Sequence, residues 1–184
     1  MAPTGRRRAL CAQAALIRET AVECRHDAAG QPSLPAELSP RPVWALKQQF
    51  GARIVLIDVR MPVETVASGS AQVTDHVIPV RVAPAGVDDS KPLPSSKLVD
   101  DPRFIENVAQ TLRISGVPRD TPIVVLCRTA NRSAVALKKL RAAGYGNVSD
   151  LIGGMDGKSN ALDEDEMGWR ASRLPISRFV DPPL

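Results

Sequence analysis

The residues best suited to chemistry lie in the segment 122–133, which reads PIVVLCRTANRS. Its apolar, mostly β-branched run predicts a buried strand that ends at Cys127, and the polar residues after it predict a loop that leads into a helix. Unpaired amides and the dipole at a helix start attract anions. With Arg128 and Arg132 nearby, this field favours the thiolate, so we expect the pKa of Cys127 to lie below the ordinary thiol value of about 8.5. A nucleophile beside an anion site suits attack on an anionic, sulfur-bearing donor.

A second interpretation of Cys127 is that it is a small apolar residue that closes a strand, as free cysteines often are. Under that interpretation, the two arginines, the polar residues between them and the helix start would serve no purpose. The composition of the whole loop therefore favours the nucleophile.

Strands and helices alternate along the part of the chain that must position this loop. Unbroken apolar runs predict strands buried on both faces, and amphipathic spacing predicts helices between them. The predicted strands cover 53–59, 122–126 and 148–152, with one more short strand within 77–82; the predicted helices run from Ser39 and Pro40 to Gly51, from Asp101 and Pro102 to Gly116, and from a cap at Asn131 or Ser133 to Ala143. This order predicts an α/β fold with a mostly parallel central sheet and helices on both faces. Ligands of such sheets bind at the carboxyl ends of the strands, where Cys127 lies.

The chain has room for one core of ordinary size, since it contains 184 residues. Residues 28–42 are rich in Pro, Gly, Ser and Ala, which predicts a linker. We therefore expect an N-terminal arm at 1–38, one domain at 39–178 and a C-terminal tail at 179–184.

The N-terminus places Arg6, Arg7 and Arg8 before an apolar run at 9–17. This pattern predicts a cytoplasmic N-terminal helix. The alternative is a segment that targets the protein to the periplasm or an organelle.

The composition argues against several classes of function. Hydrophobic residues make up 43% and charged residues 24% of the chain, which is typical of a soluble folded protein. The net charge of +4 comes from basic residues interleaved with acids, and aromatic residues are only 3%, so we expect no nucleic-acid partner. No stretch approaches the ~20 apolar residues that cross a bilayer, so we expect no membrane span. Three cysteines and two histidines form no ligand pattern, so we expect no metal and regard Cys11 and Cys24 as ordinary thiols.

The sequence CRTANRS at 127–133 resembles the active-site loop of rhodanese-like sulfurtransferases, whose single-domain members often show Cys, Arg, any residue, Gly, any residue, Arg and Ser. Other landmarks follow the same order: LIDVR at 56–60 with Glu64 after it, IP at 78–79, AAGYGNV at 142–148, LIGGM at 151–155, GW at 168–169 and LP at 174–175. The resemblance covers residues 39–177 and implies a single-domain protein of the thiosulfate sulfurtransferase type.

The resemblance implies that Cys127 is the nucleophile and persulfide carrier. It implies a loop that cradles donor and persulfide, made of Arg128, Thr129, Ala130, Asn131, Arg132 and Ser133. Asp58 and Arg60 would support the fold near the site, although an ordinary ion pair at a strand end explains them as well. The implied reaction moves sulfane sulfur from thiosulfate or a similar small anion to cyanide, a small thiol or a protein thiol, and it needs no cofactor.

Two other classes of function stay open. A non-catalytic rhodanese-like module would keep the fold and bind a partner through the same face. A cysteine-dependent phosphatase or arsenate reductase would have five residues between cysteine and arginine, whereas this loop has four between Cys127 and Arg132, with Ser133 at the phosphatase position. The smaller loop favours sulfur transfer.

The sequence departs from the family at Ala130, where glycine is usual. If this residue needs a positive φ, alanine costs about 1 kcal/mol. The usual GHIxGA signature is replaced by SGSAQVTDHVIPV at 68–80, so we expect His76 to be a solvated loop residue. Extra residues at 155–167 contain GKS, but a phosphate-binding loop would need glycine where Ile152 stands, so that motif fails. Within this stretch we expect the acidic residues 163–166 to form a solvated loop.

Overall fold

The computed structural model describes residues 25–26, 32–157 and 167–178. The predicted N-terminal helix with Cys11 and Cys24, the tail from residue 179 and the acidic residues 163–166 lie outside the described residues. Within the described part, no helix has the length and apolar character that crossing a membrane requires.

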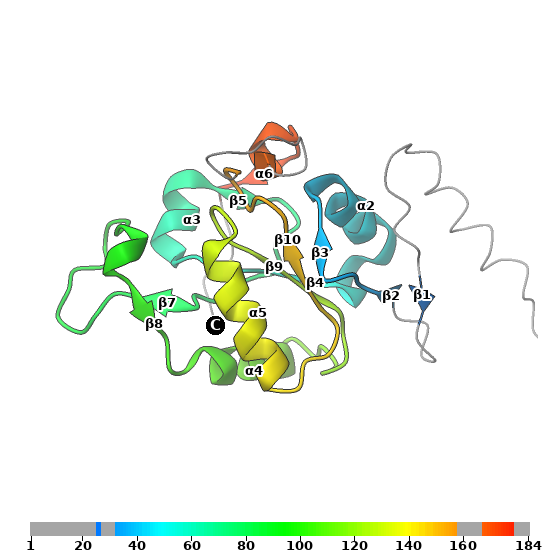
Figure 1. The fold of residues 1–184 in the computed structure, drawn as a ribbon, viewed down its shortest axis with the longest axis horizontal. Helices are drawn as coiled ribbons and strands as arrows, with labels where there is room; N and C mark the ends of the chain where they lie inside the picture. The colour runs from blue at the N-terminus through cyan, green and yellow to red at the C-terminus, as the bar shows by residue number, and fades with distance from the viewer. Residues whose placement is uncertain (1–24, 27–31, 158–166, 179–184) are drawn as a thin grey trace, which may run out of the picture.

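A sheet of five parallel strands forms the centre of the fold (Figure 1). Its order is β3 (Glu37–Leu38), β10 (Val148–Leu151), β9 (Ile123–Leu126), β4 (Val55–Asp58) and β6 (His76–Val77). Every residue of β4, β9 and β10 is buried, as expected for strands covered on both faces. The predicted parallel sheet is confirmed, and it includes β3, which precedes the domain start predicted at Ser39.

Helices cover both faces of this sheet, as predicted. They are α2 (Pro40–Phe50), α3 (Pro62–Ser68), α4 (Phe104–Ile114), α5 (Asn131–Ala142) and α6 (Gly168–Ala171). The core on one face contains the inward residues of α4 and α5, and the core on the other face contains those of α2 and α6. Cys127 directly follows β9, the middle strand, and therefore lies where the chain emerges from the sheet between the two layers of helices.

Strand β4 shows how one strand serves both cores. Val55 and Ile57 pack beneath α4 and α5, whereas Leu56 packs beneath α2, because successive side chains of a strand point to opposite faces. Trp169 is fully buried in the second core and meets Trp44 edge-on at 6.3 Å between ring centroids. Both tryptophans are therefore packing residues.

Three short antiparallel ladders lie outside the central sheet. They pair β1 (Arg25–His26) with β2 (Pro32–Ser33), β5 (Ser70–Ala71) with β11 (Ile176–Ser177), and β7 (Arg81–Val82) with β8 (Val99–Asp100). Single 3-10 turns occur at η1 (Gly51–Arg53) and η2 (Ser95–Lys97). The stretch 77–82, predicted as one strand, thus contributes to two strands, β6 and β7, of different sheets.

The starts of α4 and α5 differ from the prediction, and α3 was missed. α2 begins after Ser39 as predicted, but α4 begins only at Phe104, because the Asp101 side chain accepts the Arg103 amide and forms a local turn instead. α5 is capped by Ala130, so the caps predicted at Asn131 or Ser133 are wrong. α3 was not predicted at all.

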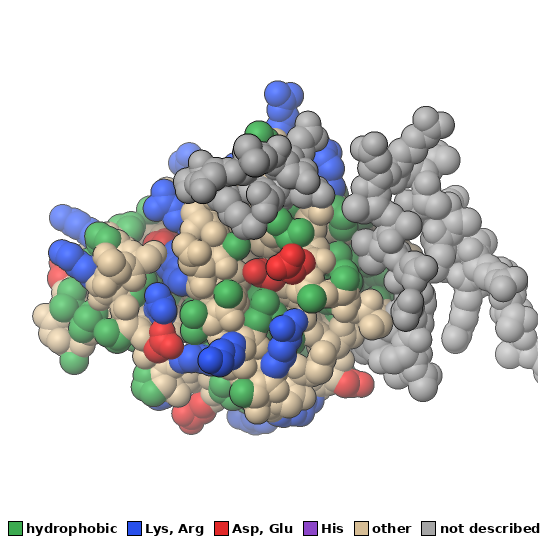
Figure 2. Space-filling view, viewed as in Figure 1, with side chains coloured by type: hydrophobic (Ala, Val, Ile, Leu, Met, Phe, Trp, Pro, Cys, Tyr) green, Lys and Arg blue, Asp and Glu red, His purple; other side chains and the backbone are tan. Residues whose placement is uncertain are grey.

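Charged side chains are spread over the face that carries α5 (Figure 2). In that view, the Lys and Arg side chains of the described residues are separated by hydrophobic and uncharged surface rather than gathered in one broad basic area.

Ala130 adopts the left-handed conformation, with φ 65° and ψ 1°. An L-residue other than glycine is strained there because its Cβ crowds the backbone. The backbone at position 130 therefore does require a positive φ, which was the condition under which we expected alanine to cost stability.

We expect Ala130→Gly to raise the free energy of unfolding by about 1 kcal/mol, because glycine removes the left-handed strain. The matched control is Ala134→Gly, at an exposed position inside α5, which should instead lower it by about 1 kcal/mol. Urea unfolding of both variants measures the two effects. Equal destabilisation by the two substitutions would contradict the strain at Ala130.

Candidate active site

Cys127 lies directly after β9, at the carboxyl edge of the sheet. The residue is only 1% exposed and contacts the core beneath α4 and α5. Its Sγ donates to Ser133 Oγ over 3.4 Å, and that hydroxyl donates to the Ala130 carbonyl over 3.1 Å. Because a hydroxyl can rotate, Ser133 can donate to the sulfur instead once the thiol loses its proton. The thiol thus has a polar partner on the side of the loop.

The loop after Cys127 offers free backbone donors. The amide N–H groups of Arg128, Thr129 and Ala130 make no backbone hydrogen bond to another residue of the described part. Successive amides that end in a left-handed residue form a concave site for an anion. The first amides of α5 add to it, because a helix start leaves them without helical partners. These groups are available to an anion, and the cradle role expected for this segment stays a prediction.

The segment after β10 packs directly on the loop backbone. Met155 N donates to the Cys127 carbonyl and Asp156 N to the Arg128 carbonyl, both over 2.9 Å. Gly154 makes this approach possible: it has φ +60°, and a Cβ there would lie 2.5 Å from the Cys127 carbonyl oxygen. Further on, the chain nearly touches itself, since a Cβ on Gly168 would lie 2.5 Å from Gly157 N.

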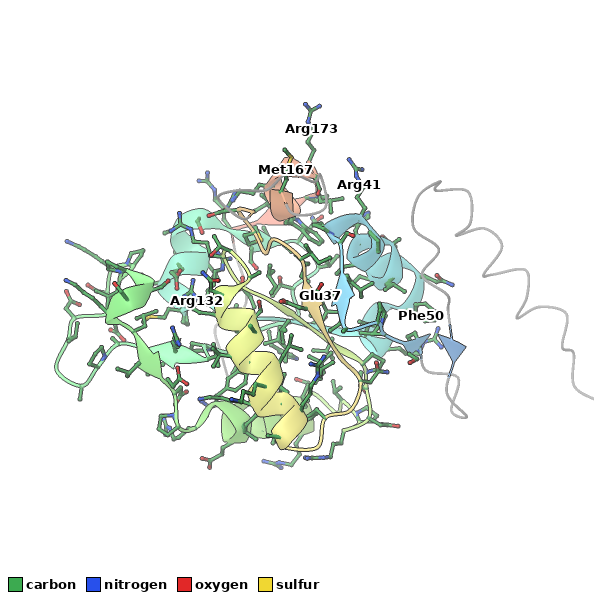
Figure 3. The ribbon with its side chains drawn as sticks, viewed as in Figure 1. Glu37, Arg41, Phe50, Arg132, Met167 and Arg173 are labelled. Carbon is green, nitrogen blue, oxygen red and sulfur yellow. The ribbon has the colours of Figure 1, made fainter. Side chains whose placement is uncertain are left out.

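Arg132 forms a buried, two-point ion pair with Glu64. Its Nη1 and Nη2 donate to the Glu64 carboxylate over 2.5 and 2.8 Å, and the Arg132 residue is 3% exposed. Glu64 also accepts the Met61 amide at the start of α3. Figure 3 shows Arg132 at the N-terminal end of α5. The pair therefore ties the start of α5, and with it the end of the cysteine loop, to α3.

Both groups of this pair are held in their charged forms. Burial alone would raise the pKa of Glu64, but the hydrogen bond and charge of Arg132 hold it below its ordinary value of 4.5. Burial alone would lower the pKa of Arg132, but Glu64, the Cys127 sulfur and Asp58 raise it. Arg132 is thus a permanent positive charge close to the sulfur.

Asp58 and Arg60 form a second buried pair, with 2.6 Å between Asp58 Oδ2 and Arg60 Nη2. Arg60 also donates to the Ser68 hydroxyl and the Gly69 carbonyl, and Asp58 accepts the Ser70 hydroxyl. The pair therefore fixes the turn at the end of α3. The structure assigns neither residue a contact with Cys127, and their role in supporting the site stays a prediction.

Arg128 lies on the rim of the site, with its side chain 63% exposed. Its Nε donates to Asp156 Oδ2 over 2.8 Å, and Arg170 Nε donates to Asp156 Oδ1 over 2.8 Å. Burial alone would raise the pKa of Asp156, but the two arginines hold it below its ordinary value of 3.8. Arg128 is thus directed to an outer ion cluster.

The structure brings all the predicted loop residues to one edge of the sheet and adds residues that the sequence did not single out for the site. The additions are Glu64, Gly154, Asp156 and Arg170. A signal for Glu64 existed, because Pro62 and an acid in the next positions are typical of a helix start. Asp156 and Arg170 carried no such signal, since their partners are set by tertiary contacts.

His76 does not behave as predicted. It lies in β6 at the edge of the central sheet and is half-buried, so the solvated loop position expected for it is wrong. Burial lowers its pKa below 6.5, with Asp75 opposing and Lys47 adding to that shift. Within the described part of the chain, no group of three or more His, Cys, Asp or Glu residues is arranged to hold a metal ion.

We expect Gly154→Ala to lower the free energy of unfolding by at least about 2 kcal/mol, because the new Cβ collides with the loop carbonyl in a left-handed backbone. Gly146→Ala is the matched control: its Cβ would meet nothing within 4 Å, so the change should stay within about 1 kcal/mol. Urea unfolding compares the two. If both glycines tolerate alanine equally, the loop is not clamped as described.

The Glu64–Arg132 pair makes stability depend on pH. The folded pKa of Glu64 lies below its unfolded value, so its contribution is fully present above pH 4.5 and is lost as the pH falls through the folded value. Glu64→Gln should cost about 3 kcal/mol at neutral pH, because it leaves Arg132 buried without a counter-charge. The gap between wild type and variant, measured by urea unfolding, should shrink below pH 4.5. A gap that is constant with pH would contradict the pairing.

Known proteins resemble the chain over different lengths. Adenylyltransferase and sulfurtransferase uba4 from Ogataea parapolymorpha is 45% identical over 47 residues, 26% of this chain and 12% of that protein. A sulfurtransferase from Allochromatium vinosum is 34% identical over 65 residues, 35% of this chain and 50% of that protein. The chain thus spans about a tenth of the length of the first relative and half of the second.

A solved structure and a family comparison cover more of the chain. The crystal structure of Rv0390 from M. tuberculosis superposes on 80% of this chain and 100% of its own, with a TM-score of 0.56 and 23% identity, and so shows the same fold. A family model described as "Rhodanese-like domain" matches residues 41–161. Because that match takes in well over half of the 184 residues, the chain belongs to the rhodanese-like domain family.

Proposed function

We propose that the protein is a sulfurtransferase that carries sulfane sulfur as a persulfide on Cys127. The observation that carries the proposal is the set of free loop amides around the end of β9, with the buried cation of Arg132 behind them. Family membership and the sulfurtransferase relatives support it. The donor is thiosulfate or a similar small anion, and the acceptor is cyanide, a small thiol or a protein thiol.

The reaction proceeds in two half-reactions. The Cys127 thiolate attacks the outer sulfur of thiosulfate; a new S–S bond forms, the old S–S bond breaks, and sulfite leaves with the bonding electron pair. The acceptor nucleophile then attacks the outer sulfur of the persulfide, and Cys127 leaves as the thiolate. Each step is an exchange at sulfur, so neither metal nor organic cofactor is required.

The loop stabilises charge at each stage. The free amides of Arg128, Thr129 and Ala130 receive the anionic donor and then the outer persulfide sulfur. Arg132 adds a fixed positive charge, and Ser133 supplies a hydroxyl donor to the thiolate. Cys127 is 1% exposed, so the donor has to be small. A compact anion such as thiosulfate fits that requirement.

The same burial favours one alternative, a non-catalytic rhodanese-like module that binds a partner through this face. The strained Ala130 supports that alternative as well. A phosphatase is less suited to the site, because the position that would carry its arginine is occupied by Ser133, whose hydroxyl bonds Cys127.

Incubation with thiosulfate should add the mass of one sulfur atom to the intact protein, and reductant should remove it. Cys127→Ser should abolish the gain, because Cys127 is the cysteine directly followed by the loop amides. Cys11→Ser and Cys24→Ser should keep it, since the sequence marks both as ordinary thiols. Intact-mass spectrometry and thiosulfate:cyanide turnover measure the two halves of the reaction. A folded wild type that gains no sulfur would support the binding module, and phosphate release from an aryl phosphate would support the phosphatase.

A further inference from the structure

Strand β11, near the end of the described residues, packs beside the end of helix α3. Ladder β5–β11 pairs Ile176 with Ala71, and the Pro175 carbonyl accepts the Gln72 amide over 3.0 Å. The same carbonyl accepts Trp169 Nε1 over 2.9 Å, and Trp169 is fully buried. Helices α3 and α6 and strand β5 lie at the same end of the fold (Figure 1). Strand β11 is thus anchored to the core where it passes the end of α3.

The contact is closest at Gly69, the residue after α3. A Cβ on Gly69 would lie 2.6 Å from Ile176 Cγ2 and 3.1 Å from the Ser177 carbonyl oxygen, so β11 leaves no room for a side chain there. Gly69 also ends the helix, since its amide donates to the Thr65 carbonyl over 2.8 Å. Ile176 is 37% exposed and belongs to neither of the two cores. It therefore packs against the end of α3 from outside them.

Arg60 restrains the same end of α3 from the central sheet. Its Nη2 donates to the Gly69 carbonyl over 2.8 Å, and Asp58 neutralises its charge. A hydrogen bond forms over a range of about 0.5 Å in donor–acceptor distance, so Arg60 alone would leave that much freedom to the end of the helix. The packing of Ile176 removes this freedom, because it fills the space next to Gly69.

Helix α3 can pass the position of this end to the cysteine loop. Its seven residues span only about 10 Å, and its first turn carries Glu64, which accepts two hydrogen bonds from Arg132. The charge of Arg132 in turn acts on the Cys127 sulfur. A rigid helix carries a displacement from one of its ends to the other. A shift at Gly69 is therefore felt at Arg132.

We propose that β11, through the contact between Ile176 and Gly69, holds α3 at the position that sets the distance from the Arg132 guanidinium to the Cys127 sulfur. Ile176 is thus a positioning residue that acts on the sulfur through α3. The proposal concerns the electrostatics of the site, and its consequence for sulfur transfer rests on the sulfurtransferase function proposed above. Loss of the contact lets Glu64 and Arg132 move away from the sulfur together and weakens the attraction for anions.

The test compares the alkylation of Cys127 by iodoacetate and by iodoacetamide, which are similar in size and differ in charge. Peptide mass spectrometry follows the modification of Cys127 in the full chain, and the ratio of the two second-order rate constants reports the attraction of an anion to the sulfur. For a unit charge, moving from about 5 to about 5.5 Å at an effective dielectric constant of about 20 weakens that attraction about 1.7-fold. Ile176→Ala should therefore lower the ratio by at least about 1.5-fold.

Ile114→Ala is the matched control. Ile114 is 48% exposed and is the last residue of α4, which leads to the start of β9, whereas Cys127 follows its end. Both variants remove the same atoms from a partly exposed position, but Ile114→Ala should keep the wild-type ratio. Urea unfolding verifies that both variants are folded under the conditions of the alkylation.

A second substitution tests the contact itself. Gly69→Ala should also lower the ratio, because its Cβ pushes against Ile176. In the double variant with Ile176→Ala, the new methyl group takes the place of the removed side chain, so the ratio should return toward that of wild type. Independent loosening would instead add the two losses. An unchanged or raised ratio for Ile176→Ala, an equal fall for Ile114→Ala, or additive losses in the double variant would overturn the proposal.

Sulfur loading from thiosulfate, measured on the same proteins, separates this inference from the proposed function. Slower loading together with a lower alkylation ratio in Ile176→Ala supports both. A wild type that takes up no sulfur, with a ratio that still falls in Ile176→Ala, overturns the sulfurtransferase proposal and supports the positioning role. A wild type that loads sulfur, with the same ratio in both proteins, overturns the positioning role alone.

Discussion

The ion pair between Arg132 and Glu64 is the contact on which the geometry of the site depends. A buried guanidinium without a counter-charge is strongly destabilising, so Arg132 requires α3 to stay where Glu64 meets it. The other end of α3 is fixed by Arg60, which bonds Ser68 and Gly69 while paired with Asp58. A seven-residue helix is thus fastened at both ends, and the start of α5 is set by it.

This arrangement places the sulfur between two environments. Sγ of Cys127 lies against the apolar core, but its hydrogen-bond partner is Ser133 on the loop side. Under the proposed function, a sulfur atom added to Sγ would have as hydrogen-bond donors the loop amides that make no backbone hydrogen bond to another described residue. The loop would therefore bind the loaded form better than the resting thiol, because an anionic persulfide uses donors that the thiol leaves unused. The strain at Ala130 is consistent with a backbone shaped for a ligand.

Much of the fold could be predicted from the sequence, because the buried strands leave a clear pattern. The runs that form β4 and β9 are apolar at nearly every position, as two-sided burial requires. Helix α3 was missed, since its seven residues carry too little periodicity and only Pro62 and Glu64 mark its start. The predicted nucleophile, Cys127, and its loop are contiguous in the sequence and were recognisable there. Asp156 was not, because its link to Arg128 joins segments 28 residues apart and depends on how β10 returns to the loop.

Gly157 and Gly168 are in near contact, so the number of residues between them matters little for the rest of the fold. Because of this contact, the entropic cost of closing the segment between them grows only slowly with its length. Sequence changes between the two glycines that keep their close approach should therefore leave Trp169 and the cysteine loop in place. The fold thus contains a position next to the cysteine loop where the length of the chain can change at a small entropic cost.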